Sequence, residues 1–184
     1  YHAVSNAVTK NGKLIYLTAT STKELDKKVK KQEINRVSLP RRFHGNPLVI
    51  PRKVWLKDLR KKVEKKQVPG KLLRLIEEQR KTSFPLILFV SEIELGEKLL
   101  NLLRQNFKDE IIELVTSKTE NRLELVEKFR NQEITILVST TILERGVTFP
   151  KVDVFVIEAN HRLFTKSTLV QIAGRVGRSM ERPT

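Results

Sequence analysis

The stretch Pro85-Leu86-Ile87-Leu88-Phe89-Val90-Ser91-Glu92-Ile93-Glu94 decides the fold of this 184-residue chain. Five consecutive apolar residues, Leu86 to Val90, stand between a proline and a serine, which predicts a short strand buried on both faces. An amphipathic helix should follow, because Ser91 and Glu94 form a capping box and leucines recur at helical spacing after them. A strand and helix of this kind predict one unit of a parallel sheet.

The same alternation continues towards the C-terminus. Apolar runs predict strands at 111–115, 134–138 and 152–157. Ser117 and Glu120 form another capping box before a stripe of Leu123, Val126 and Phe129, and a last helix is expected over 165–173. We therefore expect an α/β fold, a parallel sheet with helices on both faces. In such sheets ligands bind beyond the carboxyl ends of the strands. The residues there are Thr18–Thr20, Ser91, Thr116, Ser139–Thr141 and Glu158–Asn160.

The N-terminal third is less regular. A short strand is predicted around Leu14–Leu17, then a helix to about Lys31 that Ser21 and Glu24 begin as a capping box, and a further strand at 33–39. Residues 40–52 hold three prolines and a glycine, which indicates a linker. Helices are expected over 55–66 and, with Pro69 in the first turn, to about Lys81.

The composition favours a polyanionic partner. The formal net charge is +15, from 36 Lys and Arg against 21 Asp and Glu. Such an excess attracts nucleic acid through phosphate contacts and counterion release, although a basic solubilising surface is the alternative. The chain has no cysteine, which excludes disulfides and thiolate metal sites within it, and no apolar run of about 20 residues that would span a bilayer. It begins with Tyr1, and we expect it to be part of a longer chain.

The segment Gln171-Ile172-Ala173-Gly174-Arg175-Val176-Gly177-Arg178 places two arginines three positions apart, among glycines. Arginines at this spacing share one side of a helical turn, and glycine lets the backbone approach a ligand closely. Guanidinium groups bind phosphate through paired hydrogen bonds, and near a transferring phosphoryl group they offset transition-state charge. An ordinary basic surface loop is the alternative.

Hydroxyl residues follow two predicted strands, as Leu17-Thr18-Ala19-Thr20 and as Ser139-Thr140-Thr141 within a segment that continues to Thr148. They can hydrogen-bond a phosphate or cap a helix. The chain has no GxxxxGK[ST] phosphate loop and no acidic Asp-Glu-x-Asp or Asp-Glu-x-His box, both of which phosphoryl transfer requires.

Three other features have two interpretations each. Trp55, beside Leu56 and Leu59, predicts a packing residue, with base stacking as the alternative. The run Lys57–Lys66 predicts a solvated helix face, with phosphate binding as the alternative. The acidic residues Glu92, Glu94 and Glu97 are interpreted as helix-capping and dipole partners, with an acid/base pair as the alternative. The histidines lack acidic or cysteine neighbours, so no metal site is expected; they are His2, His44 and His161.

Taken in order, these segments resemble the motifs of superfamily 2 helicases. Leu17–Thr20 is similar to motif III, Leu86–Ser91 to motif IV, Ser139–Pro150 to motif V and Gln171–Arg178 to motif VI. Within the superfamily, Arg41–Leu48 followed by Pro51, and His161–Thr165 leading into Gln171, resemble the ComFA family of competence ATPases. The PriA helicases share mainly the Gln171–Arg178 pattern.

The resemblance implies two RecA-like domains with ATP in the cleft between them. It implies arginine fingers at Arg175 and Arg178, nucleotide contacts at Gly146, Thr148, Gln171 and Gly174, and coupling by Thr18, Ala19 and Thr20. It implies contacts to the DNA backbone at Thr140, with weaker ones at Ser91 and Thr116. Thr148 stands where related helicases often have Asp, and Thr119-Glu120-Asn121-Arg122 departs from the Gln-x-x-Arg of RNA helicases.

By this resemblance, residues 1–39 are expected to end a first RecA-like domain, 40–52 to form the interdomain linker, and 53–184 to form the second RecA-like domain. The expected function is an ATP-dependent translocase that draws single-stranded DNA into the cell during transformation. It would use ATP and Mg²⁺ bound mainly by the first domain. It would work at the cytoplasmic face of the membrane beside the uptake channel and other competence proteins. The alternatives are a PriA- or RecG-like repair helicase and a basic nucleic-acid-binding module without ATPase activity.

Overall fold

The computed structural model describes residues 9, 12–18, 20–38, 49–140 and 152–174. The chain divides into two compact units, Tyr1–Ser38 (unit 1) and Leu39–Thr184 (unit 2). Each unit is described by itself.

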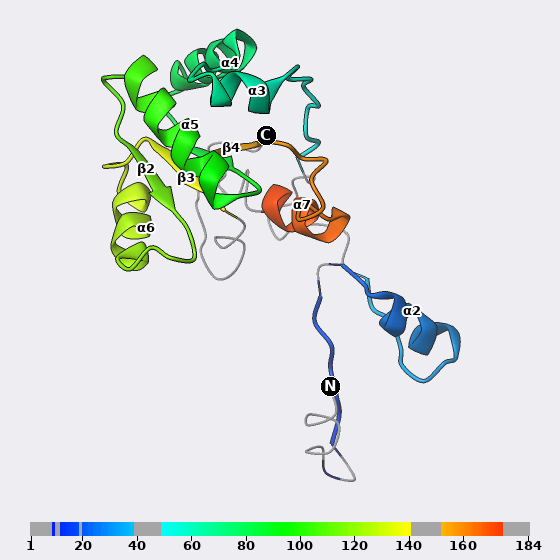
Figure 1. Ribbon diagram of the computed structural model, residues 1–184. Coiled ribbons are helices and arrows are strands. Elements are labelled where there is room, and N and C mark those ends of the chain that lie inside the picture. Colours follow the sequence, from blue (N-terminus) through cyan, green and yellow to red (C-terminus); the bar gives the residue numbers. More distant parts are fainter. Residues whose placement is uncertain (1–8, 10–11, 19, 39–48, 141–151, 175–184) are drawn as a thin grey trace. The chain divides into compact units, whose positions relative to one another are not determined.

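Unit 2 contains, within its described residues, a four-stranded sheet in the order β2-β3-β1-β4, and every pairing is parallel (Figure 1). The register places Phe89 of β1 beside Ser139 of β3 and Val156 of β4, so the strands end together. The parallel α/β sheet predicted from the sequence is confirmed. The strands are β1 Leu86–Phe89, β2 Ile112–Val115, β3 Ile136–Ser139 and β4 Asp153–Val156.

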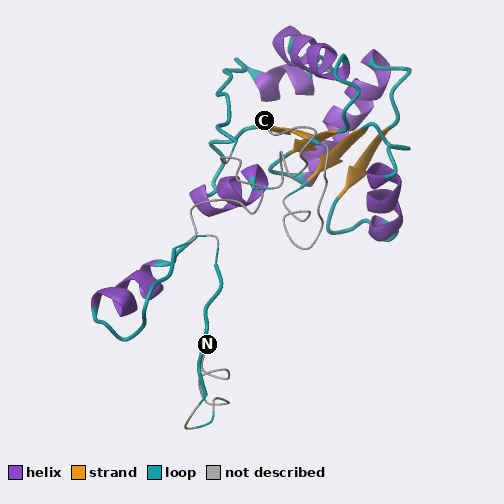
Figure 2. Cartoon of the chain, turned by 180° about the vertical axis from the view of Figure 1, so that it is seen from behind, coloured by secondary structure: helices purple, strands orange, loops and turns teal. Residues whose placement is uncertain are grey.

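Alternate residues of the strands face two separate cores. Leu86, Leu88 and Val90 pack with helices on one face of the sheet, whereas Ile87 and Phe89 pack with helices on the other. Each such side chain contributes roughly 1.5–3 kcal/mol when fully buried. The first core is covered by α3 (Leu59–Glu64), α4 (Gly70–Arg80) and α5 (Ile93–Asn106), and the second by α6 (Arg122–Arg130) and α7 (Lys166–Ala173). The view from behind shows the strands between the two sets of helices (Figure 2).

The helices begin differently from the capping-box prediction. No side-chain cap is made at Glu92, the N-cap of α5, or at Asn121, the N-cap of α6. The Ser91 hydroxyl instead donates to Glu158, so it is not available to the helix. Leu123 was expected in the buried stripe of α6 but is 78% exposed, while Val126 and Phe129 are buried as predicted. The predicted helix over 165–173 is confirmed, and Thr165 caps it by accepting from the Thr168 amide at 3.2 Å.

Unit 1 contains helix α2 (Lys23–Lys30). Its N-cap is Thr22, whose hydroxyl accepts from the Leu25 amide at 3.3 Å, and not Ser21, whose hydroxyl donates to Asp26 at 2.7 Å. The strands predicted at 14–17 and 33–39 are wrong for the described residues 12–18 and 33–38, which form no strand. A strand requires a hydrogen-bonded neighbour, and Leu17 is 92% exposed here.

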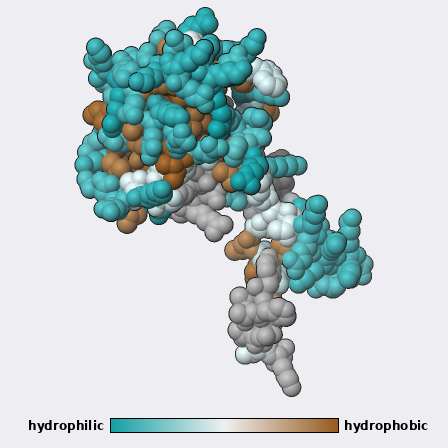
Figure 3. All heavy atoms as spheres, viewed as in Figure 1, coloured by the Kyte–Doolittle hydropathy of each residue, from teal (hydrophilic) through white to brown (hydrophobic). Residues whose placement is uncertain are grey.

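Trp55 is 76% exposed, so the expectation that it packs is also wrong. The surface seen in Figure 3 is hydrophilic over the part of unit 2 where α3 and α4 lie in Figure 1. Among the described residues, no helix combines the length and the apolar character needed to cross a bilayer.

Gly96 of α5 allows this helix to lie close against the sheet. A Cβ atom added at this position would stand 3.1 Å from Leu114 Cδ1 and 3.2 Å from Val90 Cγ2. At Gly70, in the first turn of α4, an added Cβ meets no atom within 4 Å. The two helical glycines therefore offer a matched comparison of a crowded and an open position.

We predict that Gly96→Val lowers the free energy of unfolding by roughly 1–3 kcal/mol, the usual cost of overpacking a core. Gly70→Val should change it much less, because its side chain enters open space. Urea denaturation of both variants and the parent chain measures the difference. Equal effects at the two glycines would contradict this account of the α5 packing.

Candidate functional site at the carboxyl edge of the sheet

Three neighbouring strands each lead into a buried hydroxyl residue at the same edge of the sheet. Thr116 follows β2, Thr140 follows β3, and Ser91 lies two residues beyond β1. Since β3 pairs with both β2 and β1, Thr140 lies between the other two along the edge. Parallel strands bring their carboxyl ends together, which is why residues far apart in the sequence were expected to meet here.

The Thr140 hydroxyl differs from its neighbours in having no hydrogen-bond partner within the described part of the chain. The residue is 7% exposed, and its Oγ1 atom is buried and unpaired among the described residues. The adjacent Ser139 hydroxyl donates to the Thr140 carbonyl at 2.8 Å, so that serine satisfies itself locally. A buried hydroxyl without a partner costs roughly 1–3 kcal/mol, and a ligand that accepts its proton would recover that cost.

Thr116 is occupied in organising the turn after β2. Its hydroxyl accepts from the Lys118 amide at 3.1 Å and lies 3.4 Å from the Thr119 hydroxyl. The Thr116 amide donates to the Thr119 hydroxyl at 2.9 Å. These contacts fix the turn that leads into α6, so the local role of Thr116 is structural.

Ser91 belongs to a charged cluster that the sequence did not predict. Its hydroxyl donates to Glu158 Oε2 at 3.1 Å. The Arg60 guanidinium of α3 donates to both Glu158 oxygens, at 2.7 and 2.6 Å, and to both Glu92 oxygens, at 3.1 Å each. Paired hydrogen bonds of this geometry are the strongest that a guanidinium makes. We call Arg60, Ser91, Glu92 and Glu158 the edge cluster.

The edge cluster joins three segments at the carboxyl edge. Glu92 begins α5, Glu158 follows β4, and Arg60 comes from α3. Glu158 adopts a left-handed backbone conformation with φ of 54°, which is uncommon for a residue with a side chain and is held here by its hydrogen bonds. His161 Nε2 also lies 3.4 Å from Glu92 Oε1. Arg60 therefore ties the ends of β1 and β4 together.

Arg60 shifts the acidity of its two partners. The pKa of Glu158 is lowered, first by its hydrogen bonds with Arg60 and against the effect of its partial burial. The pKa of Glu92 is lowered for the same first reason, and the carboxylates in turn raise the pKa of Arg60. All three groups stay charged near neutral pH. Sequence analysis missed the cluster because Arg60 was grouped with the Lys57–Lys66 face and Glu92 with the helix caps.

Two of the proposed nucleotide contacts lie at the end of α7. Gln171 is half-buried in the last turn of the helix, and the Gly174 amide donates to the Val170 carbonyl at 2.8 Å. In unit 1, the Thr18 hydroxyl donates to the Thr20 carbonyl at 2.6 Å, which closes a local turn. The predicted site residues Ala19, Gly146, Thr148, Arg175 and Arg178 lie outside the described residues.

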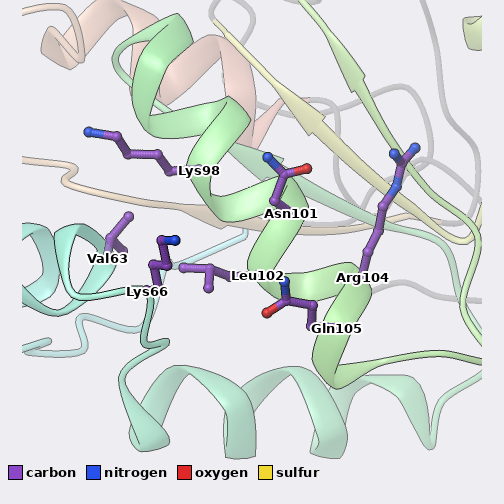
Figure 4. A pocket seen from close by; sticks show the side chains of 7 residues that line it. All are labelled: Val63, Lys66, Lys98, Asn101, Leu102, Arg104 and Gln105. Atoms are coloured by element: carbon purple, nitrogen blue, oxygen red, sulfur yellow. The ribbon is translucent and has the colours of Figure 1, made fainter.

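A pocket of about 380 Å³ lies between α3 and α5 (Figure 4). It is lined by Val63 of α3 and by Lys66, which lies just beyond that helix. The side chains that line it from α5 include Lys98, Asn101, Leu102 and Gln105. Lys98 is paired with Glu94 at 2.6 Å, and Arg104, which also lines the pocket, is paired with Glu113 at 2.8 Å. Because α5 runs back from the carboxyl edge, most of these residues lie towards the opposite end of the sheet. We therefore place the candidate site at the carboxyl edge.

Within the part of the chain that the structure describes, no group of three His, Asp or Glu side chains is arranged to hold a metal ion.

Comparison with known proteins agrees with this architecture. Residues 67–180 match the family described as the helicase conserved C-terminal domain. Competence protein ComFA of Streptococcus pneumoniae (strain ATCC BAA-255 / R6) is 62% identical over 184 residues, which is 100% of this chain and 43% of that protein. ComFA of Bacillus subtilis (strain 168) is 40% identical over 181 residues, covering 97% of this chain and 38% of the relative. The chain thus spans less than half the length of these relatives.

Among solved structures, Saccharomyces cerevisiae Dbp5 bound to RNA and ADP BeF3 aligns with a TM-score of 0.61 at 21% identity. The alignment covers 95% of this chain and 44% of that one. At this identity the likeness concerns the fold alone, and it agrees with a RecA-like arrangement of the parallel sheet and its helices.

The edge cluster leads to a stability prediction. Arg60→Met should lower the free energy of unfolding at pH 7 by on the order of 1–2 kcal/mol, because it leaves two carboxylates without their shared partner. Lys98→Met is the matched control, since it removes an exposed ion pair within one helix and should have a much smaller effect on stability. Urea denaturation of both variants provides the comparison.

The same variant has a defined pH dependence. A carboxyl whose pKa is lowered in the folded state contributes stability above its ordinary pKa, and this contribution is lost as the pH falls through the lowered value. The difference in free energy of unfolding between the parent and Arg60→Met should therefore be constant near neutral pH. It should shrink as the pH falls below 4.5, the ordinary pKa of the carboxyl group. A difference that grows as the pH falls would show that Arg60 does not act through these carboxylates.

Proposed function

Because the chain belongs to the helicase conserved C-terminal domain family, we propose that it is the second motor domain of an ATP-dependent DNA translocase serving DNA uptake in natural transformation. The two competence relatives cover nearly the whole chain, which favours this role over a PriA- or RecG-like repair helicase. The translocated substrate proposed is single-stranded DNA.

The observation that carries the proposal is the buried Thr140 hydroxyl at the carboxyl edge, which has no partner among residues 49–140 and 152–174. In a sheet of this type, ligands bind at that edge. A hydroxyl donates to a phosphate oxygen without reading the base, as a motor that passes any sequence requires. Ser91 already donates its proton to Glu158, and Thr116 is engaged in its turn, so Thr140 is the hydroxyl we assign to the DNA backbone.

The edge cluster would keep this DNA-binding edge in place. Arg60 binds Glu158 and Glu92, and Glu158 accepts from Ser91. These hydrogen bonds fix the ends of β1 and β4 relative to each other. Fixed positions matter because a contact displaced by about 1 Å loses much of its effect in a phosphoryl-transfer motor. In this proposal Arg60 is a positioning residue that acts through Glu92, Glu158 and Ser91.

The nucleotide side of the proposal rests on the C-terminal segment. Arg175 and Arg178 would act as arginine fingers on the transferring phosphoryl group of ATP. Gly146, Thr148, Gln171 and Gly174 would line the nucleotide, and Thr18, Ala19 and Thr20 would couple its state to DNA. ATP and Mg²⁺ would be bound mainly by another domain of the longer protein, since this sequence contains no GxxxxGK[ST] loop. We propose that this chain alone does not hydrolyse ATP.

The partners and location follow from the competence relatives. We propose that the protein acts at the cytoplasmic face of the membrane, beside the DNA-uptake channel and other competence proteins. The net charge of +15 also suits a binding module without ATPase activity. That alternative predicts DNA binding without DNA-stimulated ATP turnover in the longer protein.

We predict that Thr140→Val weakens binding of single-stranded DNA about tenfold or more, because a hydrogen bond to a charged group contributes roughly 1.5–3 kcal/mol. Stability should stay the same or rise, since no bond of the free protein is lost. Fluorescence anisotropy with labelled oligo-dT measures the affinity.

The control is Thr135→Val, directly before β3 and away from the carboxyl edge, where the hydroxyl contacts the backbone of Ile111. This variant should be less stable yet bind DNA normally, the reverse of Thr140→Val. Unchanged affinity in Thr140→Val would remove Thr140 from the DNA contact.

In the longer protein, Arg178→Ala should reduce DNA-stimulated ATP turnover by roughly 10³–10⁵-fold, the contribution of arginine fingers elsewhere. Binding of ATP and DNA should change far less, and Arg178→Lys should rescue poorly because a point charge does not reproduce the planar guanidinium. Turnover at saturating ATP and DNA, beside separate binding curves, is the measurement. Normal turnover with weakened DNA binding would leave Arg178 as part of a basic surface.

A further inference from the structure

The segment that leads into α3 presents an indole ring to solvent. Between Lys53 and Lys57 the residues alternate, since Val54 and Leu56 are half-buried while Lys53, Trp55 and Lys57 are exposed. This is the pattern of an extended chain with one side against the protein. Trp55 is 76% exposed, an unusual position for a large ring that proteins normally bury.

The outward position of Trp55 is fixed by its neighbours in the chain. Leu56 packs against the core beneath α3, α4 and α5, and Leu59, in the first turn of α3, is buried in that core. With Leu56 held inward, an extended backbone turns Trp55 to the opposite side. The exposure of the ring therefore follows from the way the adjacent residues pack.

The surroundings of the ring are cationic. Lys53 Nζ lies 4.9 Å from the centre of the indole ring, within the range of a cation–π contact. Residues 51–66 contain eight Lys and Arg and two Asp and Glu. The centre of a protein–protein interface is usually depleted of charged residues. A ring among lysines instead suits a ligand that carries flat bases on an anionic chain.

We propose that Trp55 is a base-stacking site for single-stranded DNA, with Lys53 and Lys57 on the adjoining phosphates. This inference rests on the proposed function and adds to it a contact to the bases that is separate from Thr140. Every base has a flat π-face, so stacking on Trp55 holds the strand without selecting its sequence. Duplex DNA keeps its bases stacked inside and would not use the ring.

Trp55 is the only tryptophan of the chain, so its fluorescence reports on this position alone. We expect a single-stranded oligo-dT of about 12 nucleotides, a length within known site sizes, to quench this fluorescence at low salt. An abasic oligonucleotide of equal length should bind through its phosphates with little quenching, and a duplex should also quench little. Anisotropy of the labelled strands records binding independently of the ring.

The variants separate stacking from charge and from general apolar contact. Trp55→Ala should weaken oligo-dT binding about 5- to 150-fold, the equivalent of 1–3 kcal/mol for one stacked base, and leave abasic binding unchanged. Trp55→Phe should retain most of the affinity. Ile50→Ala removes another exposed apolar side chain of the same segment and should have little effect. Because Trp55 is exposed, these variants should fold as the parent does.

Two results would overturn the inference in distinguishable ways. If oligo-dT binds but neither quenches Trp55 nor loses affinity in Trp55→Ala, the stacking site is wrong, the ring is a surface for protein docking, and the proposed DNA-binding function stands. If no single-stranded DNA binds even at low salt, both the stacking site and the proposed function are wrong.

Discussion

The burial of both faces of the parallel sheet is the constraint on which the rest of unit 2 depends. Because α3, α4 and α5 cover one face and α6 and α7 the other, the strands must be apolar along their length. Polar chemistry is then confined to the ends of the strands. Ser91, Thr116, Thr140 and Glu158 all follow a strand at the carboxyl edge. The site is therefore a consequence of how the core is covered.

At that edge, hydrogen bonding divides the polar residues into two kinds. Arg60, Glu92, Glu158 and Ser91 satisfy one another, and such a cluster holds geometry without needing a ligand. The Thr140 hydroxyl has no partner among the described residues. A fold retains an unpaired buried hydroxyl at a cost, so we interpret it as a place where binding recovers free energy. In the proposed function, the paired groups would position the site, and the Thr140 hydroxyl would contact the ligand.

The sequence predicts the fold better than it predicts the contacts. Apolar runs such as Leu86–Val90 have few alternatives, because five consecutive buried residues fit a strand covered on both sides. The capping boxes predicted hydrogen bonds less well. The Ser91 hydroxyl can cap the start of α5 or bind Glu158, a residue 67 positions away in the sequence, and it binds Glu158. The Arg60 contacts were missed for the same reason. Tertiary packing decides which basic residue of the 57–66 run pairs with which carboxylate. The spacing of residues along the sequence carries no information about that packing.

The positive charge of the chain is distributed unevenly between the carboxyl edge and the segment before α3. A net charge of +15 attracts a polyanion but does not say where it binds. Arg60 of the 51–66 segment belongs to the edge cluster, and its charge is balanced there by Glu92 and Glu158. Lys53, by contrast, lies over the exposed ring of Trp55. In the proposed function, the carboxyl edge would bind DNA through neutral donors such as Thr140. The basic segment before α3 can bind it through charge and stacking, and these two modes differ in how steeply they weaken with salt.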